Sequence, residues 1–80
     1  MLTMIKVGIK RLLAGPEQKQ YRITYGGDDV YRLEGWYVEM RGAGLGWFWT
    51  EAHRFHFDTE IEASRNARQW AKRDNGVFIE

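Results

Sequence analysis

Residues 59–76 read TEIEASRNARQWAKRDNG and predict one amphipathic α-helix over about residues 59–74. The stretch begins as a capping box, in which the Thr59 hydroxyl accepts the amide hydrogen of Glu62 and the Glu62 side chain reaches back. Acidic residues in the first turn and basic residues in the last turn also suit the helix dipole. The sequence therefore predicts both the existence of this helix and the residue at which it begins.

The same stretch predicts where the helix ends and which side is buried. Asn75-Gly76 is typical of a left-handed C-terminal stop. At 100° per residue, Trp70 falls on one stripe with three alanines, Ala63, Ala67 and Ala71. Small alanine side chains allow a helix to approach a sheet closely, so we expect this stripe to pack on one, with Trp70 as its anchor.

Alternation of apolar and polar side chains predicts β-strands on both sides of the helix. We expect an α+β fold, an antiparallel meander of strands with the one helix lying across it. Glycine-rich segments at 26–29 and 42–46 are typical of turns. The predicted strands cover residues 4–10, 21–25, 30–34, 36–41 and 47–50, a short stretch around Phe55 and Phe57, and the closing residues 77–79.

Length and composition limit the classes of protein that fit. With 80 residues the chain is expected to form a single domain, residues 1–80, whose core relies on four Trp, four Tyr and four Phe. The absence of cysteine excludes disulfides and thiolate zinc sites, and it favours a reducing compartment, so we expect a cytoplasmic protein. No stretch approaches the roughly 20 apolar residues of a membrane span.

Three motifs with catalytic or ligand-binding potential lack the rest of their signatures. The glycines of 42–46 have neither the spacing of a dinucleotide-binding loop nor a following helix, so they predict a flexible hairpin turn. His53 and His56 are three residues apart without a third ligand, and Ser64 has no nucleophile motif around it. We therefore expect no catalytic residues, no metal site and no cofactor.

Two surfaces are candidates for binding. The first is the helix side opposite the alanine stripe, where an apolar residue shares the outward face with cations, namely Ile61, Arg65, Arg68 and Lys72. An ordinary solvated face is the alternative. The second is the hairpin, including Leu45 and Phe48, where Phe48 and Tyr37 are expected to be exposed on one sheet face.

The aromatic residues of the hairpin allow two binding modes. With Arg41 and Arg54 they would stack nucleic-acid bases, or they would form hot spots for a protein partner. They would instead be covered if the N-terminal segment packs on that face. The same N-terminal segment is basic, with Lys6, Lys10 and Arg11, although the whole chain carries a net charge of only +1.

Residues 36–39 (WYVE), 46–49 (GWFW) and 55–60 (FHFDTE), with Ala63 and Ala67, resemble small orphan proteins of phages and mobile elements. Those proteins often have a strand, a glycine turn, a tryptophan strand, a helix of the form F-x-T/S-x-x-E-A and a last strand. The small size, the absence of cysteine and the lack of a catalytic signature are also similar to anti-CRISPR proteins and other phage inhibitors of host defence. This resemblance implies binding to a host protein complex.

We therefore expect a small non-enzymatic protein-binding module, a phage-encoded inhibitor or accessory protein that acts on a host protein complex. The alternative is a nucleic-acid-binding protein that uses the basic N-terminal segment and the exposed aromatics. No membrane partner is expected, and the chain would be a monomer or a homodimer. The predicted binding residues are Ile61, Arg65, Arg68, Lys72, Leu45 and Phe48.

Overall fold

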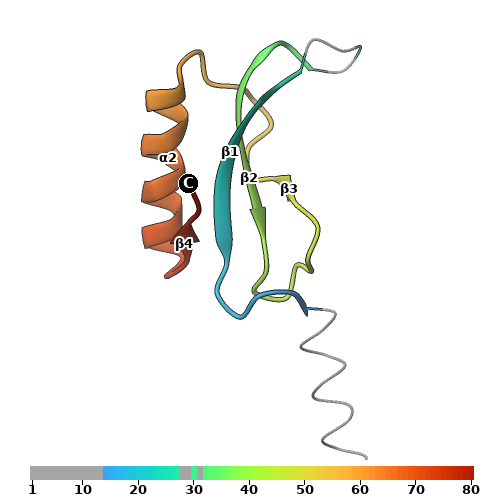
Figure 1. The fold of residues 1–80 in the computed structure, drawn as a ribbon, viewed down its shortest axis with the longest axis vertical. Coiled ribbons are helices and arrows are strands. Elements are labelled where there is room, and N and C mark those ends of the chain that lie inside the picture. The colour runs from blue at the N-terminus through green and yellow to red at the C-terminus, as the bar shows by residue number, and fades with distance from the viewer. Residues whose placement is uncertain (1–13, 28–29, 31) are drawn as a thin grey trace, which may run out of the picture.

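The computed structural model describes residues 14–27, 30 and 32–80. Within these ranges one helix covers one face of a four-stranded sheet in the order β3-β2-β1-β4 (Figure 1). The α+β class is therefore confirmed. The elements are β1 (Gln20–Gly26), β2 (Gly35–Arg41), β3 (Thr50–Glu51), α2 (Glu60–Arg73) and β4 (Val77–Phe78).

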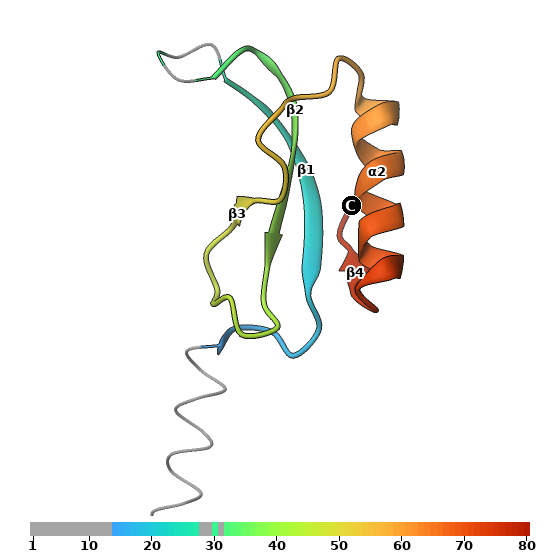
Figure 2. The ribbon, with the colours of Figure 1, turned by 180° about the vertical axis from the view of Figure 1, so that it is seen from behind.

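The sheet is mixed rather than an antiparallel meander throughout. β2 pairs antiparallel with β1 and with β3, whereas β4 pairs parallel with β1. The reason is the path of the chain, which Figure 2 shows from behind: α2 runs back along the sheet, and a tight turn after it reverses the chain direction. β4 consequently returns along the free edge of β1 in the same direction as β1.

The core lies between α2 and the strands β1 and β2. Tyr21 and Val38 are almost fully buried, as are the three alanines of the predicted helix stripe, Ala63, Ala67 and Ala71. The expectation of close alanine packing is thus confirmed. Trp70 is only half buried and lies at the margin of the core, where its ring contacts the rings of Phe57 and His53.

The predicted N-terminus of α2 is confirmed. The Thr59 Oγ1 accepts a hydrogen bond from the Glu62 amide at 3.2 Å, as a cap should. At the other end, Asn75 rather than Gly76 takes the left-handed conformation, with φ of 55°. Gly76 is needed for another reason, because a Cβ on it would lie 2.3 Å from the Lys19 carbonyl oxygen of the neighbouring strand.

Three predicted strands differ from the structure, and the strand predicted at 4–10 lies outside the described residues. β1 and β2 pair up to Gly26 and Gly35, so the described residues between 27 and 34 form the connection and not a strand. Residues 47–49 lie across the sheet face, and only Thr50–Glu51 pairs with β2. Around 55–57 a single bridge joins Phe57 to Trp36, because the helix cap follows at once.

The glycine-rich loop 42–46 is held by the backbone of an earlier segment and is not an open, flexible hairpin turn. The Ala43 amide donates to the Pro16 carbonyl at 2.8 Å, and the Gly46 amide donates to the Ala14 carbonyl at 2.9 Å. A Cβ on Gly15 would lie 2.1 Å from the Gly46 oxygen, so the two backbones meet at the closest possible approach. This contact fixes the position of the residues that follow the loop.

Candidate protein-binding surfaces

The first surface is the exposed side of α2, here called the outer helix surface: Ile61, Arg65, Arg68 and Lys72. Ile61 is 70% exposed although it is a large aliphatic residue in the first turn of the helix. It lines a shallow open depression together with Ser64, Arg65, Arg68 and Gln69. The structure therefore brings these four predicted residues together on one stripe, as the helical spacing predicts.

Of the three cations on the outer helix surface, one has an ion-pair partner among the described residues. The Arg68 guanidinium lies 2.6 Å from a Glu80 carboxylate oxygen and also stacks over the Phe78 ring, at 5.1 Å from its centroid. In the part of the chain that the structure describes, neither Arg65 nor Lys72 forms an ion pair. Ile61 thus lies one turn from Arg65, and Lys72 lies about two turns further along the same side of the helix; neither cation pairs with a described carboxylate.

The opposite side of the sheet is here called the open face, and within residues 14–27, 30 and 32–80 no helix covers it. Because side chains alternate along a strand, every second residue of β1 and β2 points away from α2. These residues lie opposite one another in the pairing of the two strands. Arg22 pairs with Glu39 at 2.9 Å, and the Arg41 Nε donates to the Gln20 Oε1 at 2.7 Å. The ring of Trp49 lies against both guanidiniums, with its centroid 4.2 Å from Arg22 and 4.4 Å from Arg41. Trp49 and its two arginines therefore cover the middle of this face.

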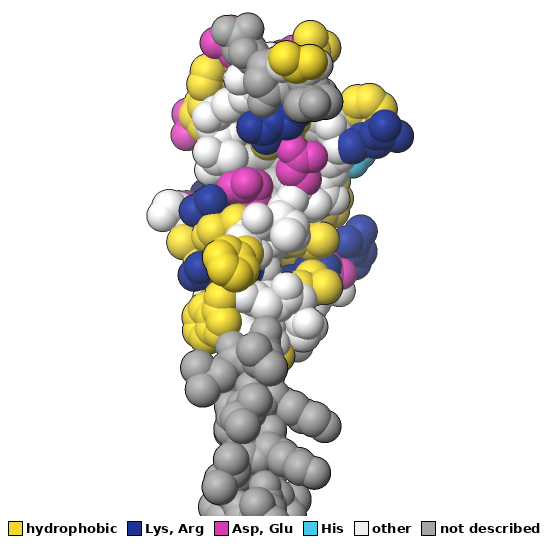
Figure 3. Space-filling view, turned by 90° about the vertical axis from the view of Figure 1, so that its right-hand side faces the viewer, with side chains coloured by type: hydrophobic (Ala, Val, Ile, Leu, Met, Phe, Trp, Pro, Cys, Tyr) yellow, Lys and Arg dark blue, Asp and Glu magenta, His cyan; other side chains and the backbone are white. Residues whose placement is uncertain are grey.

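The loop end of the open face presents three large hydrophobic side chains, here called the aromatic loop surface: Leu45, Trp47 and Phe48. They are 52%, 49% and 86% exposed, respectively. Figure 3 shows hydrophobic side chains gathered at this end, beside Lys and Arg side chains. Arg41 lies over the Trp47 ring at 5.8 Å. This surface combines residue types that are enriched at binding hot spots.

One residue expected on this face is not exposed. Tyr37 is only 2% exposed, because its ring lies under the Arg32 guanidinium and its hydroxyl donates to the Leu33 carbonyl at 2.5 Å. The prediction that Tyr37 and Phe48 form one exposed pair is therefore wrong for Tyr37. Trp47, which is 49% exposed, is the second exposed aromatic residue beside Phe48. Its exposure was hard to predict from the sequence, because Trp47 lies in a predicted strand.

The six predicted binding residues divide into two groups on opposite sides of the molecule. Ile61, Arg65, Arg68 and Lys72 lie on α2, whereas Leu45 and Phe48 lie on the loop, and the sheet separates them (Figure 1). A single flat partner surface cannot contact both groups at once. The two surfaces therefore have to be considered as separate sites.

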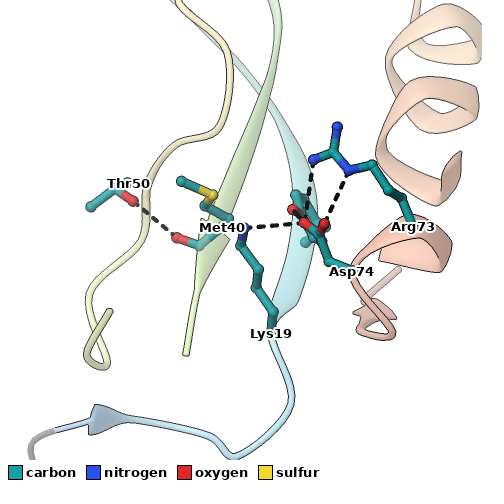
Figure 4. Close-up of polar contacts among 6 residues, drawn as sticks. Lys19, Met40, Thr50, Arg73 and Asp74 are labelled. Carbon is teal, nitrogen blue, oxygen red and sulfur yellow. Dashed lines mark hydrogen bonds and ion pairs between the residues drawn. The ribbon is translucent and has the colours of Figure 1, made fainter. Parts of the chain in front are cut away.

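A third cluster joins the end of α2 to β1. The Asp74 carboxylate accepts hydrogen bonds from the Tyr21 hydroxyl and from Arg73, whose Nε is 3.0 Å away, and it pairs with Lys19 at 3.1 Å (Figure 4). Arg73 first, then Tyr21 and Lys19, hold the pKa of Asp74 well below its usual range. Sequence reasoning did not find this cluster, because its members come from distant parts of the chain.

The residues considered for catalysis or metal binding do not come together. His53 packs among the rings of Phe57 and Trp70, whereas His56 faces Asp58, with 3.3 Å between Nε2 and the carboxylate. Among the described residues, no group of three or more His, Cys, Asp or Glu side chains is placed to hold a metal ion. In the same ranges, no helix is both long and apolar enough to cross a membrane.

No protein-family model, curated protein or solved structure matches this chain. The functional assignment therefore rests on the two surfaces.

Proposed function

We propose that this protein is a non-enzymatic protein-binding module that contacts its partner through the outer helix surface. The observation that carries this proposal is Ile61, 70% exposed beside Arg65 and Arg68 over a shallow depression. An exposed apolar residue beside arginines fits a protein interface, where Arg is enriched and an apolar centre is bordered by a polar rim. Burying Ile61 would remove its side chain from water while the cations stay at the rim.

The charge of this surface defines the chemistry of the partner. Because Arg65 and Lys72 lack described counter-charges, the complementary surface should be acidic around an apolar pocket or ridge. A host protein complex that is blocked by a phage-encoded inhibitor is the more specific form of this proposal. That form rests on the resemblance of residues 36–80 alone.

Nucleic-acid binding is the alternative proposal, and the exposed rings of Trp47 and Phe48 beside Arg41 are its support. Two ion pairs weigh against it, since Glu39 and Glu51 on the open face engage Arg22 and Arg32 and so compete with phosphates for these guanidiniums. The basic N-terminal residues Lys6, Lys10 and Arg11 lie outside the described residues. Protein binding through α2 is therefore the proposal that the described charges favour.

The test is a pull-down from bacterial lysate with and without nuclease, read by mass spectrometry. Arg65→Glu should weaken capture of the partner by about tenfold, because it reverses a charge beside the Ile61 anchor. Arg54→Glu is the matched control, since Arg54 is also an exposed arginine but lines a depression with Arg32 and Tyr37 that contains no residue of α2, and it stacks on Phe55. Equal capture by all three proteins would contradict the proposal, and capture that disappears with nuclease would favour the nucleic-acid alternative.

A further inference from the structure

We infer that the partner contacts this protein with an extended segment, which lies along the sheet edge beside β1 and places an apolar side chain in a pocket between α2 and the sheet. The inference deepens the proposed function and rests on it, because this pocket adjoins the outer helix surface. Three observations support it: unpaired backbone groups at the sheet edge, an apolar pocket next to them, and side chains that the pocket shares with the outer helix surface.

The strand β4 accompanies only the first part of β1. Among the described residues, β4 pairs with Gln20 and Tyr21 and with no later residue of β1 (Figure 1). Val77 N donates to the Lys19 carbonyl at 2.9 Å, and Ile79 N donates to the Tyr21 carbonyl at 2.8 Å. Beyond Tyr21, one edge of β1 therefore has no neighbouring strand in the ranges that the structure describes.

The backbone amide and carbonyl of Ile23 face this edge. Successive residues of a strand direct these groups to opposite sides, and Tyr21, two residues earlier, bonds to the β4 side. Val38, which lies opposite Ile23 in β2, accepts instead from the Ala52 amide at 2.9 Å. No hydrogen bond joins either backbone group of Ile23 to another described residue. An extended peptide that adds to a sheet edge pairs with groups of this kind.

A pocket of about 350 Å³ opens beside Ile23, between α2 and the sheet. Apolar side chains from β1, β2 and the C-terminal segment line it, namely Ile23, Trp36, Phe78 and Ile79. The volume is near the lower end of the roughly 300–1,000 Å³ of ligand pockets, so it suits one or two side chains of a peptide. Because every second side chain of an added strand points to the α2 side of the sheet, an apolar side chain of that strand would reach this pocket.

The rim of the pocket carries charges of both signs, from Glu60, Arg68 and Glu80. The Arg68 guanidinium pairs with Glu80 at 2.6 Å, and these side chains are 60% and 76% exposed. An exposed ion pair contributes little to stability, so an entering segment is able to displace it. Two carboxylates beside an apolar floor do not suit the phosphates of a nucleic-acid strand. The fitting occupant is therefore an apolar side chain of a peptide.

The pocket continues into the outer helix surface. Ser64 and Arg68 line both the pocket and the shallow depression that contains Ile61 and Arg65. A partner segment paired with β1 would thus bring the neighbouring part of the partner onto α2, where its acidic groups would meet Arg65. This continuity favours the partner of the outer helix surface over an unrelated ligand.

The test selects a display library of random octapeptides against the full chain, and peptides with apolar residues at every second position should be enriched. Amide hydrogen exchange is then followed by NMR. In the free protein the Ile23 amide should exchange faster than the amides of Arg22 and Thr24, which face β2. A bound peptide should slow the exchange of the Ile23 amide by about tenfold. This measurement uses the unaltered chain, so it does not depend on the folding of any variant.

Two tryptophan variants test the pocket itself. Ser64→Trp should weaken peptide binding by about tenfold, because the indole would fill the mouth of the pocket. Gln69→Trp is the matched control: it adds the same side chain to the same helix, but Gln69 lines the outer depression and not the pocket. Gln69→Trp should therefore bind the peptide as the wild type does.

Four outcomes would overturn the inference: no enrichment of alternating apolar peptides, an Ile23 amide whose exchange a bound peptide does not slow, equal peptide binding by Ser64→Trp and the wild type, or protection of Ile23 that rises with protein concentration without peptide. The last would mean that a second copy occupies the edge. Capture of the lysate partner by Arg65→Glu tests the proposed function separately. Undiminished capture by that variant, with a protected Ile23 amide, would contradict the proposed function and leave the edge site intact.

Discussion

Replacing Gly76 by Ala should destabilise the protein strongly, whereas replacing Asn75 by Gly should not. Gly76 does not have a positive φ, so the usual conformational reason for a glycine at a helix stop does not apply to it. Asn75 has a φ of 55°, a conformation that glycine adopts more easily than any other residue. Asn75 therefore takes the left-handed position that a helix-stop motif usually gives to glycine, and Gly76 is needed for its lack of a side chain.

The size of the effect follows from contacts of the backbone. An alanine Cβ at position 76 would lie 2.3 Å from the Lys19 carbonyl oxygen and 3.2 Å from its carbon, so β4 would have to move by about 1 Å to reach ordinary contact. Val77 N donates to that same oxygen at 2.9 Å, and Gly76 N donates to Ala71 O at 2.7 Å. Losing or stretching these two bonds costs about 1 kcal/mol each, and the overpacking adds roughly another 1 kcal/mol.

We therefore expect Gly76→Ala to lower the free energy of unfolding by about 3 kcal/mol, and Asn75→Gly to change it by less than about 0.5 kcal/mol. The assay is urea and thermal denaturation followed by far-UV circular dichroism. For a domain of this size the melting temperature of Gly76→Ala should fall by roughly 10–20 °C. A melting temperature for Gly76→Ala that lies within two degrees of the wild type would refute the argument from close approach.

Two further predictions concern the cluster at Asp74 and the core. Because the pKa of Asp74 is depressed in the folded state, its ionised form contributes stability that is present above the pKa of the unfolded chain, about 4, and is lost as the pH falls further. Urea midpoints measured from pH 6 to pH 2 should fall less steeply for Asp74→Asn than for the wild type. The control is Asp58→Asn, which removes an exposed carboxylate. An Asp74→Asn protein whose midpoints fall as steeply as those of the wild type would contradict this prediction. Val38→Ala should cost about 2–3 kcal/mol, because the side chain is fully buried between α2 and the sheet, and Ile61→Ala should cost less than about 0.5 kcal/mol in the same denaturation assay. If Val38→Ala and Ile61→Ala lowered the free energy of unfolding by similar amounts, the burial of one of these two side chains would be incorrect.

The helix could be predicted from the sequence because its signals are local. The Thr59 cap, the alanine stripe and the stop at Asn75 all lie within one turn of the residues they affect. The outer helix surface follows from the same spacing. Local information therefore accounts for the four predicted binding residues that the structure brings together on α2.

The sheet could not be predicted to the same degree, because the first and last residues of each strand depend on pairing with strands that are distant in the sequence. Alternation places Trp47 in a strand, but the Arg41 guanidinium and the position of loop 42–46 turn residues 47–49 across the sheet face. Gly76 is required because it lies against the backbone of Lys19, which precedes it by 57 positions in the sequence. Alternation alone also does not show whether β4 runs parallel or antiparallel to β1. These constraints arise only when the chain has folded.

The arrangement of one helix on a four-stranded sheet explains why the two candidate binding surfaces lie on opposite sides of the molecule. α2 buries one face of the sheet, and the aromatic side chains of the other face are partly covered by side chains and loops of the same chain. Arg32 covers Tyr37 at one end, and Trp49 with its two arginines covers the middle. At the loop end Arg41 lies over the Trp47 ring, whereas Phe48 is 86% exposed.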